Sequence, residues 1–139
     1  MLYKFRGILI MLLGTAACLL VLSSCAPISV PERTAADFFT AYFNAEPDNL
    51  FRLAYFSADS RGDVDSKKKA LIAWSKLSKD GCERNGGIRR IRIRLGNSPA
   101  LLREGEKLPA GVDVTFKNGD KQLLNTTLIN INGEWKILF

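Results

Sequence analysis

The C-terminal end of the chain alternates apolar and polar residues, and two Asn-Gly pairs interrupt that alternation. Asn118-Gly119 and Asn132-Gly133 are strong hairpin signals, because both residue types accept the positive φ angles that tight turns require. The pattern predicts strands over residues 112–116, over a long stretch up to Ile131, and over 134–139. These strands form an antiparallel meander with one buried face, and this meander constrains the fold more than any other part of the sequence.

The length of the first turn decides which face is buried, because a slip of one residue moves every side chain to the opposite face. A two-residue turn would direct the valines away from the other apolar positions. A three-residue turn over 117–119, with Gly119 in the left-handed region, instead places Val112 opposite Leu124. We therefore predict that turn, or an equivalent bulge. One core face then collects Val112, Val114, Phe116, Leu124, Leu128, Trp135, Ile137 and Phe139.

The opposite face of the same strands also carries apolar side chains, which is more than a face in contact with water needs. We expect this face to be covered by another part of the chain or to be used for association, for example in a homodimer. The residues of this candidate association face are Leu123, Ile129, Ile131 and Leu138.

Helical spacing precedes the strands. Two aromatic pairs with a spacing of four residues follow Pro31, which suits a first helical turn, and they predict a core-facing helix that ends near Asn44. The pairs are Phe38 with Tyr42 and Phe39 with Phe43. A second, short helix is expected from Asp48 as its cap through Ala54, with Tyr55 and Phe56 continuing its apolar character.

A third helix is expected to start at a cap formed by Asp65 or Ser66 and to reach about Cys82, followed by flexible Gly86-Gly87. Its expected apolar side contains Leu71, Trp74, Leu77 or Ser78, and Cys82, while lysines lie mostly around the others. Helices followed by a meander predict an α+β domain, with N-terminal helices packed on a curved antiparallel sheet.

Three arginines alternate with apolar residues in the segment between the third helix and the meander. Arg90, Arg92 and Arg94 share one side of a predicted half-buried strand. The ordinary interpretation is a solvated strand whose charges prevent mispairing. The alternative is a basic surface that faces anionic head groups. Residues 96–110 then form a long excursion, with a helical turn at Leu101-Leu102.

The N-terminal residues predict a secretory signal, with Lys4 and Arg6 before an uncharged apolar run. Leu22-Ser23-Ser24-Cys25 resembles the lipobox of bacterial lipoproteins. That resemblance implies cleavage of residues 1–24, acylation of Cys25 and a lipidated tether over 25–30, since several acyl chains hold a protein firmly at a membrane. A cut before Cys18 and an uncleaved membrane helix are the alternatives. The absence of Asp after Cys25 favours the outer membrane, facing the periplasm, in a Gram-negative host.

Composition excludes several functions. The 139 residues include no His, which removes the commonest general base and metal ligand. Loss of two cations, Lys4 and Arg6, lowers the formal net charge from +6 to +4, and no nucleic-acid-binding motif is present. Cys82 remains the one thiol besides Cys25, so an internal disulfide is excluded. We expect no metal, no cofactor and no catalytic site.

The chain resembles lipoproteins that carry domain of unknown function 4878, in the nuclear-transport-factor-2-like, or cystatin-like, superfamily. The motifs that carry the resemblance are Pro31-Glu32-Arg33, the Lys-rich helix before Gly86-Gly87, Asn118-Gly119, and the segment 132–137. The resemblance implies a single cone-shaped domain over 31–139, often with a pocket, and no established activity. The long 96–110 segment departs from it.

Three classes of function remain. We expect a non-enzymatic envelope lipoprotein whose cavity or sheet binds a small molecule, a glycan or a protein. An alternative is a structural or assembly subunit of an envelope complex. In the third, an enzyme, some superfamily members use an Asp base and a Tyr donor, for which Asp37, Tyr42 and Tyr55 are the candidates.

Overall fold

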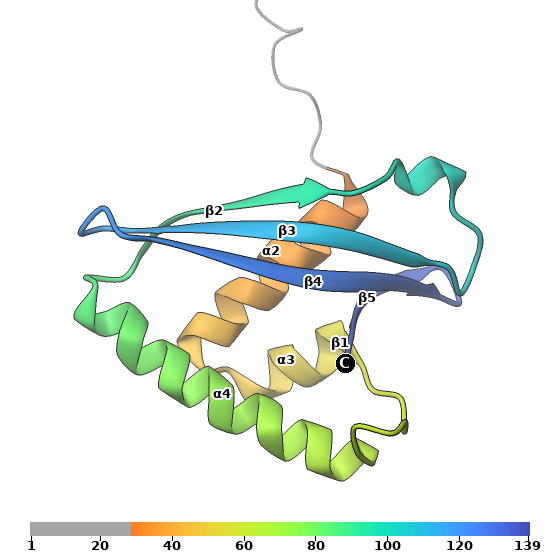
Figure 1. Ribbon diagram of the computed structural model, residues 1–139, viewed down its shortest axis with the longest axis horizontal. Coiled ribbons are helices and arrows are strands. Elements are labelled where there is room, and N and C mark those ends of the chain that lie inside the picture. The colour runs from red at the N-terminus through yellow and green to blue at the C-terminus, as the bar shows by residue number, and fades with distance from the viewer. Residues whose placement is uncertain (1–28) are drawn as a thin grey trace, which may run out of the picture.

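The computed structural model describes residues 29–139. The predicted signal peptide, the processing site Leu22-Ser23-Ser24 with Cys25, and most of the tether lie outside the described residues. The helices are α2 (Val30–Asn44), α3 (Pro47–Leu53) and α4 (Val64–Arg84). The strands are β1 (Ala54–Tyr55), β2 (Ile88–Leu95), β3 (Lys107–Phe116), β4 (Lys121–Ile131) and β5 (Glu134–Leu138), with a short 3₁₀ helix η1 (Pro99–Leu101) between β2 and β3 (Figure 1).

The fold class is α+β, as the sequence predicts, but the curved sheet is mixed rather than wholly antiparallel. The strand order is β1-β5-β4-β3-β2, and β1 pairs parallel to β5, with Ala54 beside Ile137. The second helix ends at Leu53, so the prediction that it runs through Ala54 is wrong. Its backbone is extended there, and Tyr55 O accepts a hydrogen bond from Phe139 N at 2.9 Å. Pairing with the C-terminal strand thus overrides the local helical preference.

The predicted register of the meander is confirmed. Val112 lies opposite Leu124, and Gly119 has φ +95°, as the three-residue turn requires. Leu128 pairs with Ile137 across the second turn. The inner face packs into the core, where Val112, Val114, Phe116, Leu128 and Ile137 are buried and Leu124, Trp135 and Phe139 are partly buried.

Two helix starts differ from the prediction. Helix α4 begins at Val64, because Asp63 Oδ1 accepts a hydrogen bond from Ser66 N at 2.8 Å and so serves as the cap. Helix α3 begins at Pro47, with Glu46 in the cap position. Proline already has the φ of a helix and lacks the N–H that a first turn leaves unpaired, so it starts this helix one residue before Asp48.

Part of the predicted 96–110 excursion is strand, since β3 starts at Lys107. Pro109 fits inside β3 because its carbonyl oxygen accepts from Gly96 N at 2.7 Å, just beyond the end of β2. The nitrogen of Pro109 lies on the same side of β3 as its carbonyl oxygen, at a point where β2 has already ended. The missing N–H therefore removes no hydrogen bond between the two strands.

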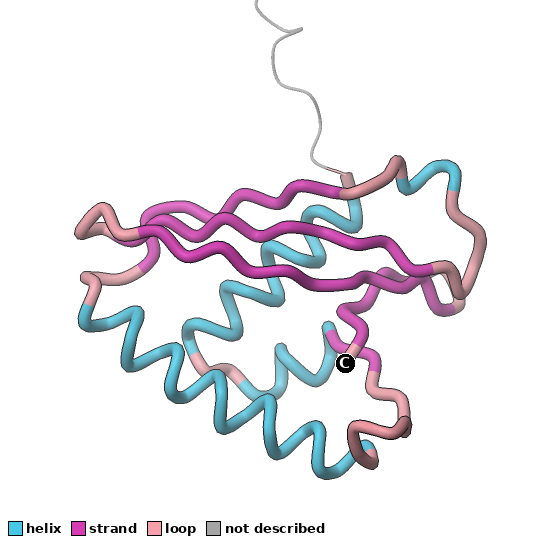
Figure 2. Tube along the Cα trace, viewed as in Figure 1, coloured by secondary structure: helices cyan, strands magenta, loops and turns pink. Residues whose placement is uncertain are grey.

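Helix α2 lies across the inner face of the sheet, and α4 packs on α2 (Figure 1). The core joins the aromatic stripe of α2 (Phe38, Phe39, Phe43) to the inner face of β3, β4 and β5. In Figure 2 the helices lie below and behind the strands, and α4 diverges from the sheet. Because α4 rests mainly on α2, its flank toward β4 and β5 is left unfilled.

Candidate functional site

A cleft follows α4 on the side that faces β4 and β5. Its largest hollow, of about 480 Å³, is lined by Arg61, Ser66, Lys67, Ala70, Trp74, Leu138 and Phe139. A second hollow, of about 330 Å³, shares Trp74, Leu138 and Phe139 and extends to Tyr42, Leu124 and Thr126. A third, of about 270 Å³, lies near the end of α4 between Leu77 and Gln122. The hollows form a row because one long helix diverges from one curved sheet.

Two aromatic residues, Trp74 and Phe139, form one wall of the largest hollow. Trp74 is 53% exposed, and its ring centroid lies 6.1 Å from that of Phe139. The ring centroids of Phe139 and Phe56 are 5.8 Å apart, and those of Phe56 and Phe51 are 6.0 Å apart. Lys68 Nζ lies 5.6 Å from the Phe51 ring, a cation–π distance. Contact between the exposed indole and water is unfavourable. An apolar ligand that covered the indole in this hollow would remove that contact and so gain binding free energy.

Cations surround the same hollow at the N-terminal end of α4. Lys67 is buried, and its Nζ contacts Asp59 Oδ1 at 3.0 Å and donates to Phe139 O at 3.1 Å and to Ser57 O. Arg61 binds Asp59 Oδ2 at 2.7 Å while its side chain remains 71% exposed. The hydrogen bonds from Arg61 hold the pKa of the Asp59 carboxyl well below its usual range. Arg61 therefore offers further N–H donors to a ligand while Asp59 stays ionised.

The structure places the predicted basic patch on the far side of the sheet from this cleft. Arg90, Arg92 and Arg94 are exposed on β2, the edge strand. Arg94 Nη2 lies 2.8 Å from Asp113 Oδ1. This contact holds the pKa of Asp113 below its usual value.

The four residues of the candidate association face do not form one exposed patch. Leu123 is 71% exposed, but Ile129 is buried, and Ile131 and Leu138 are half-buried. Ile129 lies between Lys107 and Lys136 in the sheet, whose long stems can cover apolar surface. Leu138 lines the cleft instead.

Of the three enzyme candidates, only Tyr42 lines the cleft. Asp37 is exposed on α2 and is not among the residues that line the three hollows. Tyr42 lies among aromatic rings, 6.4 Å from Phe38, and Tyr55 is 37% exposed on β1. Within residues 29–139, no cluster of His, Cys, Asp and Glu could hold a metal ion, and no helix is long and apolar enough to cross a membrane.

Comparison with solved structures identifies the fold. A Campylobacter jejuni protein described as an NTF2-like transpeptidase superposes with a TM-score of 0.63 over 80% of this chain and 99% of the other, at 18% identity. The fold is NTF2-like. No protein-family model and no curated protein sequence matches the chain. At this identity the likeness extends to the fold alone.

Sequence reasoning missed the lining of the cleft. Trp74 was expected on the core side of the third helix together with Leu71, but only Leu71 is fully buried. Lys67 was expected among the solvated lysines, yet it is 7% exposed. No local signal marks this lining, because Phe51, Phe56, Trp74 and Phe139 come from separate segments and meet through ring contacts only in the folded chain.

Proposed function

We propose that this protein is a lipid-anchored bacterial envelope lipoprotein, of the group that carries domain of unknown function 4878, whose domain binds a small molecule in the cleft beside α4. The proposed ligand has an apolar body and an acidic end. The protein acts as a binding module and catalyses no reaction. In a Gram-negative host it lies at the outer membrane and faces the periplasm.

The observation that carries the binding proposal is the position of exposed Trp74 between an aromatic wall and a cationic end. The hollow of about 480 Å³ falls within the range of about 300–1,000 Å³ that small-molecule sites occupy. The aromatic wall suits an apolar chain, and Arg61 suits a carboxylate or phosphate because its planar donors bind two oxygens at once.

Binding is tested by titrating the purified protein with dodecanoate and following the fluorescence of Trp74 in a Trp135→Phe background. We expect saturable quenching or enhancement that Trp74→Phe abolishes. Dodecanol supplies the same apolar chain without the charge. Arg61→Gln should weaken dodecanoate about tenfold, a loss typical of one charged hydrogen bond, and leave dodecanol unchanged. Leu123→Ala, at a position exposed far from the aromatic wall, is the matched control.

Two results would contradict this proposal. Equal affinity for dodecanoate and dodecanol would show that the site does not recognise an acidic end on the ligand. The cleft would be excluded as an apolar site by two negative results together. Neither compound would give a saturable response, and native mass spectrometry of protein purified gently from the envelope would show the mass of the protein without a bound ligand. A protein-binding or assembly role would then take its place.

The anchor is tested separately. Mass spectrometry of the mature N-terminal peptide should show an acylated Cys25, and Cys25→Ser should accumulate as an uncleaved precursor. An unmodified N-terminus at another residue would refute the lipoprotein assignment without affecting the cleft.

The outer side of the sheet supports one alternative, a role as a structural subunit. Leu123 is 71% exposed on β4 and offers an apolar contact on this side. A dimer in native mass spectrometry that Leu123→Lys dissociates would favour this alternative.

A further inference from the structure

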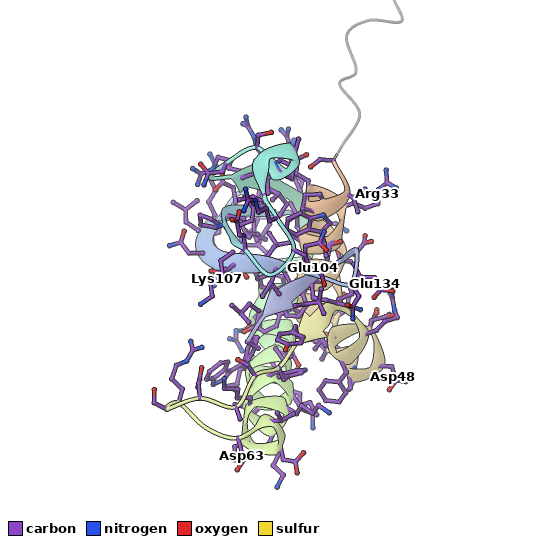
Figure 3. All side chains as sticks on the ribbon, turned by 90° about the vertical axis from the view of Figure 1, so that its right-hand side faces the viewer. Arg33, Asp48, Asp63, Glu104, Lys107 and Glu134 are labelled. Carbon is purple, nitrogen blue, oxygen red and sulfur yellow. The ribbon has the colours of Figure 1, made fainter. Side chains whose placement is uncertain are left out.

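Basic side chains gather on the outer face of β2, β3 and β4, opposite the helices. The β-sheet register places five cationic residues on this face of the three strands and one anionic residue, Asp113. The cations are Arg90, Arg92, Arg94, Lys107 and Lys121, and all five are exposed. Figure 3 shows Lys107 on the side of the sheet away from Arg33 of α2. The positive charge of these three strands is therefore concentrated on one face.

A hollow of about 490 Å³ lies within this basic face. It is lined by Arg94, Gly96, Pro109, Gly111, Asn125 and Thr127, among others. Gly111 is paired with Arg94, and a Cβ at Gly111 would lie 3.0 Å from Arg94 Nη2. The absence of a side chain at Gly111 thus lets the guanidinium lie over the backbone of β3. A guanidinium with neighbouring amide and hydroxyl groups is suited to phosphate oxygens.

The described chain begins next to this face. Helix α2 runs antiparallel to β2, because Thr40 and Asn44 near its end share a hollow with Arg89 and Arg90 at the start of β2. The start of α2 at Val30 therefore lies by the end of β2 (Figure 1). The four steps from Cys25 to Ser29 span at most about 14 Å. The strand from Arg90 to Arg94 is about 13 Å long.

We propose that the basic outer face of β2 and β3, with Arg90, Arg92 and Arg94, lies on the anionic phosphate head groups of the membrane that holds the lipid on Cys25. This inference rests on the lipid anchor of the proposed function and is independent of the ligand in the cleft. The short tether holds the start of α2 within about two Debye lengths of the surface. The outer face is therefore close enough to lie on the head groups, where each basic residue adds attraction.

The consequence is a fixed orientation on the membrane. The basic face is directed toward the lipid, and the cationic end of the cleft is directed away from it. Figure 3 shows Asp63, which caps α4 beside that end, at the opposite end of the molecule from Arg33 in the first turns of α2, where the tether joins the domain. The cleft mouth is then open to ligands or partners in the periplasm.

The orientation is measured on the full mature chain in nanodiscs that contain doxyl-labelled lipid, either wholly zwitterionic or with added phosphatidylglycerol. A fluorophore is placed by Asn97→Cys, next to the end of β2, or by Ala73→Cys on α4, in a Cys82→Ser background. We expect quenching at residue 97 only on the anionic discs. The triple variant Arg90→Gln, Arg92→Gln and Arg94→Gln should lower the ratio of protein docked on the membrane to protein held only by the tether by about 25-fold. This figure assigns about fivefold to each of the two arginines without an acidic partner.

The matched control removes three cations from α4 through Lys76→Gln, Lys79→Gln and Arg84→Gln. Each triple variant removes one ion-paired cation. In the control it is Lys79, which lies 3.9 Å from Glu83, and on β2 it is Arg94, which is paired with Asp113. The control should retain the quenching, and about 1 M salt should remove it in the parent protein by shortening the Debye length to about 3 Å.

Three outcomes would overturn the inference: equal quenching on neutral and anionic discs, equal loss in the control, or stronger quenching at residue 73 than at 97. The arginines would then serve only to protect the edge strand. Mass spectrometry of the same sample reports acylation of Cys25, so failure of the anchor is recognised separately. In that case, co-sedimentation of the full chain with phosphatidylglycerol vesicles, compared between the two triple variants, decides whether the basic face binds.

Discussion

Lys67→Met is the most informative perturbation of this domain. Lys67 is 7% exposed, and its ammonium group joins α4 to two other segments: the loop after β1, through Ser57 O and Asp59 Oδ1, and the end of the chain, through Phe139 O. Methionine has a similar length and keeps the buried stem apolar, so the substitution removes mainly the charge and its hydrogen bonds.

The magnitude follows from the partners that remain. Asp59 keeps its bonds to Arg61, and Phe139 O keeps a bond from Ser57 N at 3.5 Å. Ser57 O has no other donor among residues 29–139. Hydrogen bonds from a charged group contribute about 1.5–3 kcal/mol each, and removal of the ammonium also relieves its desolvation cost. We expect the free energy of unfolding to fall by about 2–3 kcal/mol.

The assay is urea unfolding followed by circular dichroism. With a slope of about 1.5 kcal/mol/M, the midpoint should fall by about 1.5–2 M. Lys69→Met, on the same helix but exposed, is the control and should stay within about 0.5 kcal/mol of the parent. If Lys67→Met is as stable as the control but no longer binds dodecanoate, the structural role is refuted and Lys67 is a ligand-binding residue.

Three further predictions concern other parts of the fold. Leu128→Ala should lower the free energy of unfolding by about 3–4 kcal/mol because the side chain is fully buried. Leu123→Ala should change it by about 0.5 kcal/mol at most, and equal effects of the two in urea unfolding would contradict the register. Asp59→Asn should destabilise at pH 7, and its difference from the parent should narrow as the pH falls below about 4. The pKa of Asp59 is lower in the folded state, so its stabilisation is present above the unfolded pKa and lost as the pH falls toward the folded one; a difference that grows in acid would show that the sign is wrong. The Cys82 thiol should react slowly with iodoacetamide at about pH 8 until urea unfolds the protein, because burial raises its pKa, and fast native alkylation would disprove this burial.

Much of the sheet could be predicted because its determinants are local. The position of Gly119 in the first turn sets the pairing of Val112 with Leu124, and the period of two then assigns every inward side chain of β3 and β4. The start of α2 at Pro31 was similarly readable. The starts of α3 and α4 were misplaced by two or three residues, since Pro47 starts α3 before Asp48 and several Asp and Ser residues compete for the cap position of α4.

The errors with larger consequences involve contacts between distant segments. Periodicity assigned Trp74 and Leu71 to one apolar side of a helix, but it cannot report where the neighbouring element ends. The same limit applies to Lys67, whose partners Ser57 and Phe139 come from different parts of the chain. Ile129 was expected on a face that is covered or used for association, and its burial depends on the neighbours Lys107 and Lys136 that the assembled sheet supplies.

Residue types and their spacing are enough to establish the α+β class, the strand register and the chemistry that is absent, such as every function that needs His. These properties depend on turn length and side-chain period, which are fixed along the chain. The parallel β1, the cleft beside α4 and the placement of the arginines on an edge next to the start of the domain emerge only from three-dimensional packing. They depend on how α4 packs on α2 and how far the sheet curves, which the whole set of long-range contacts determines together.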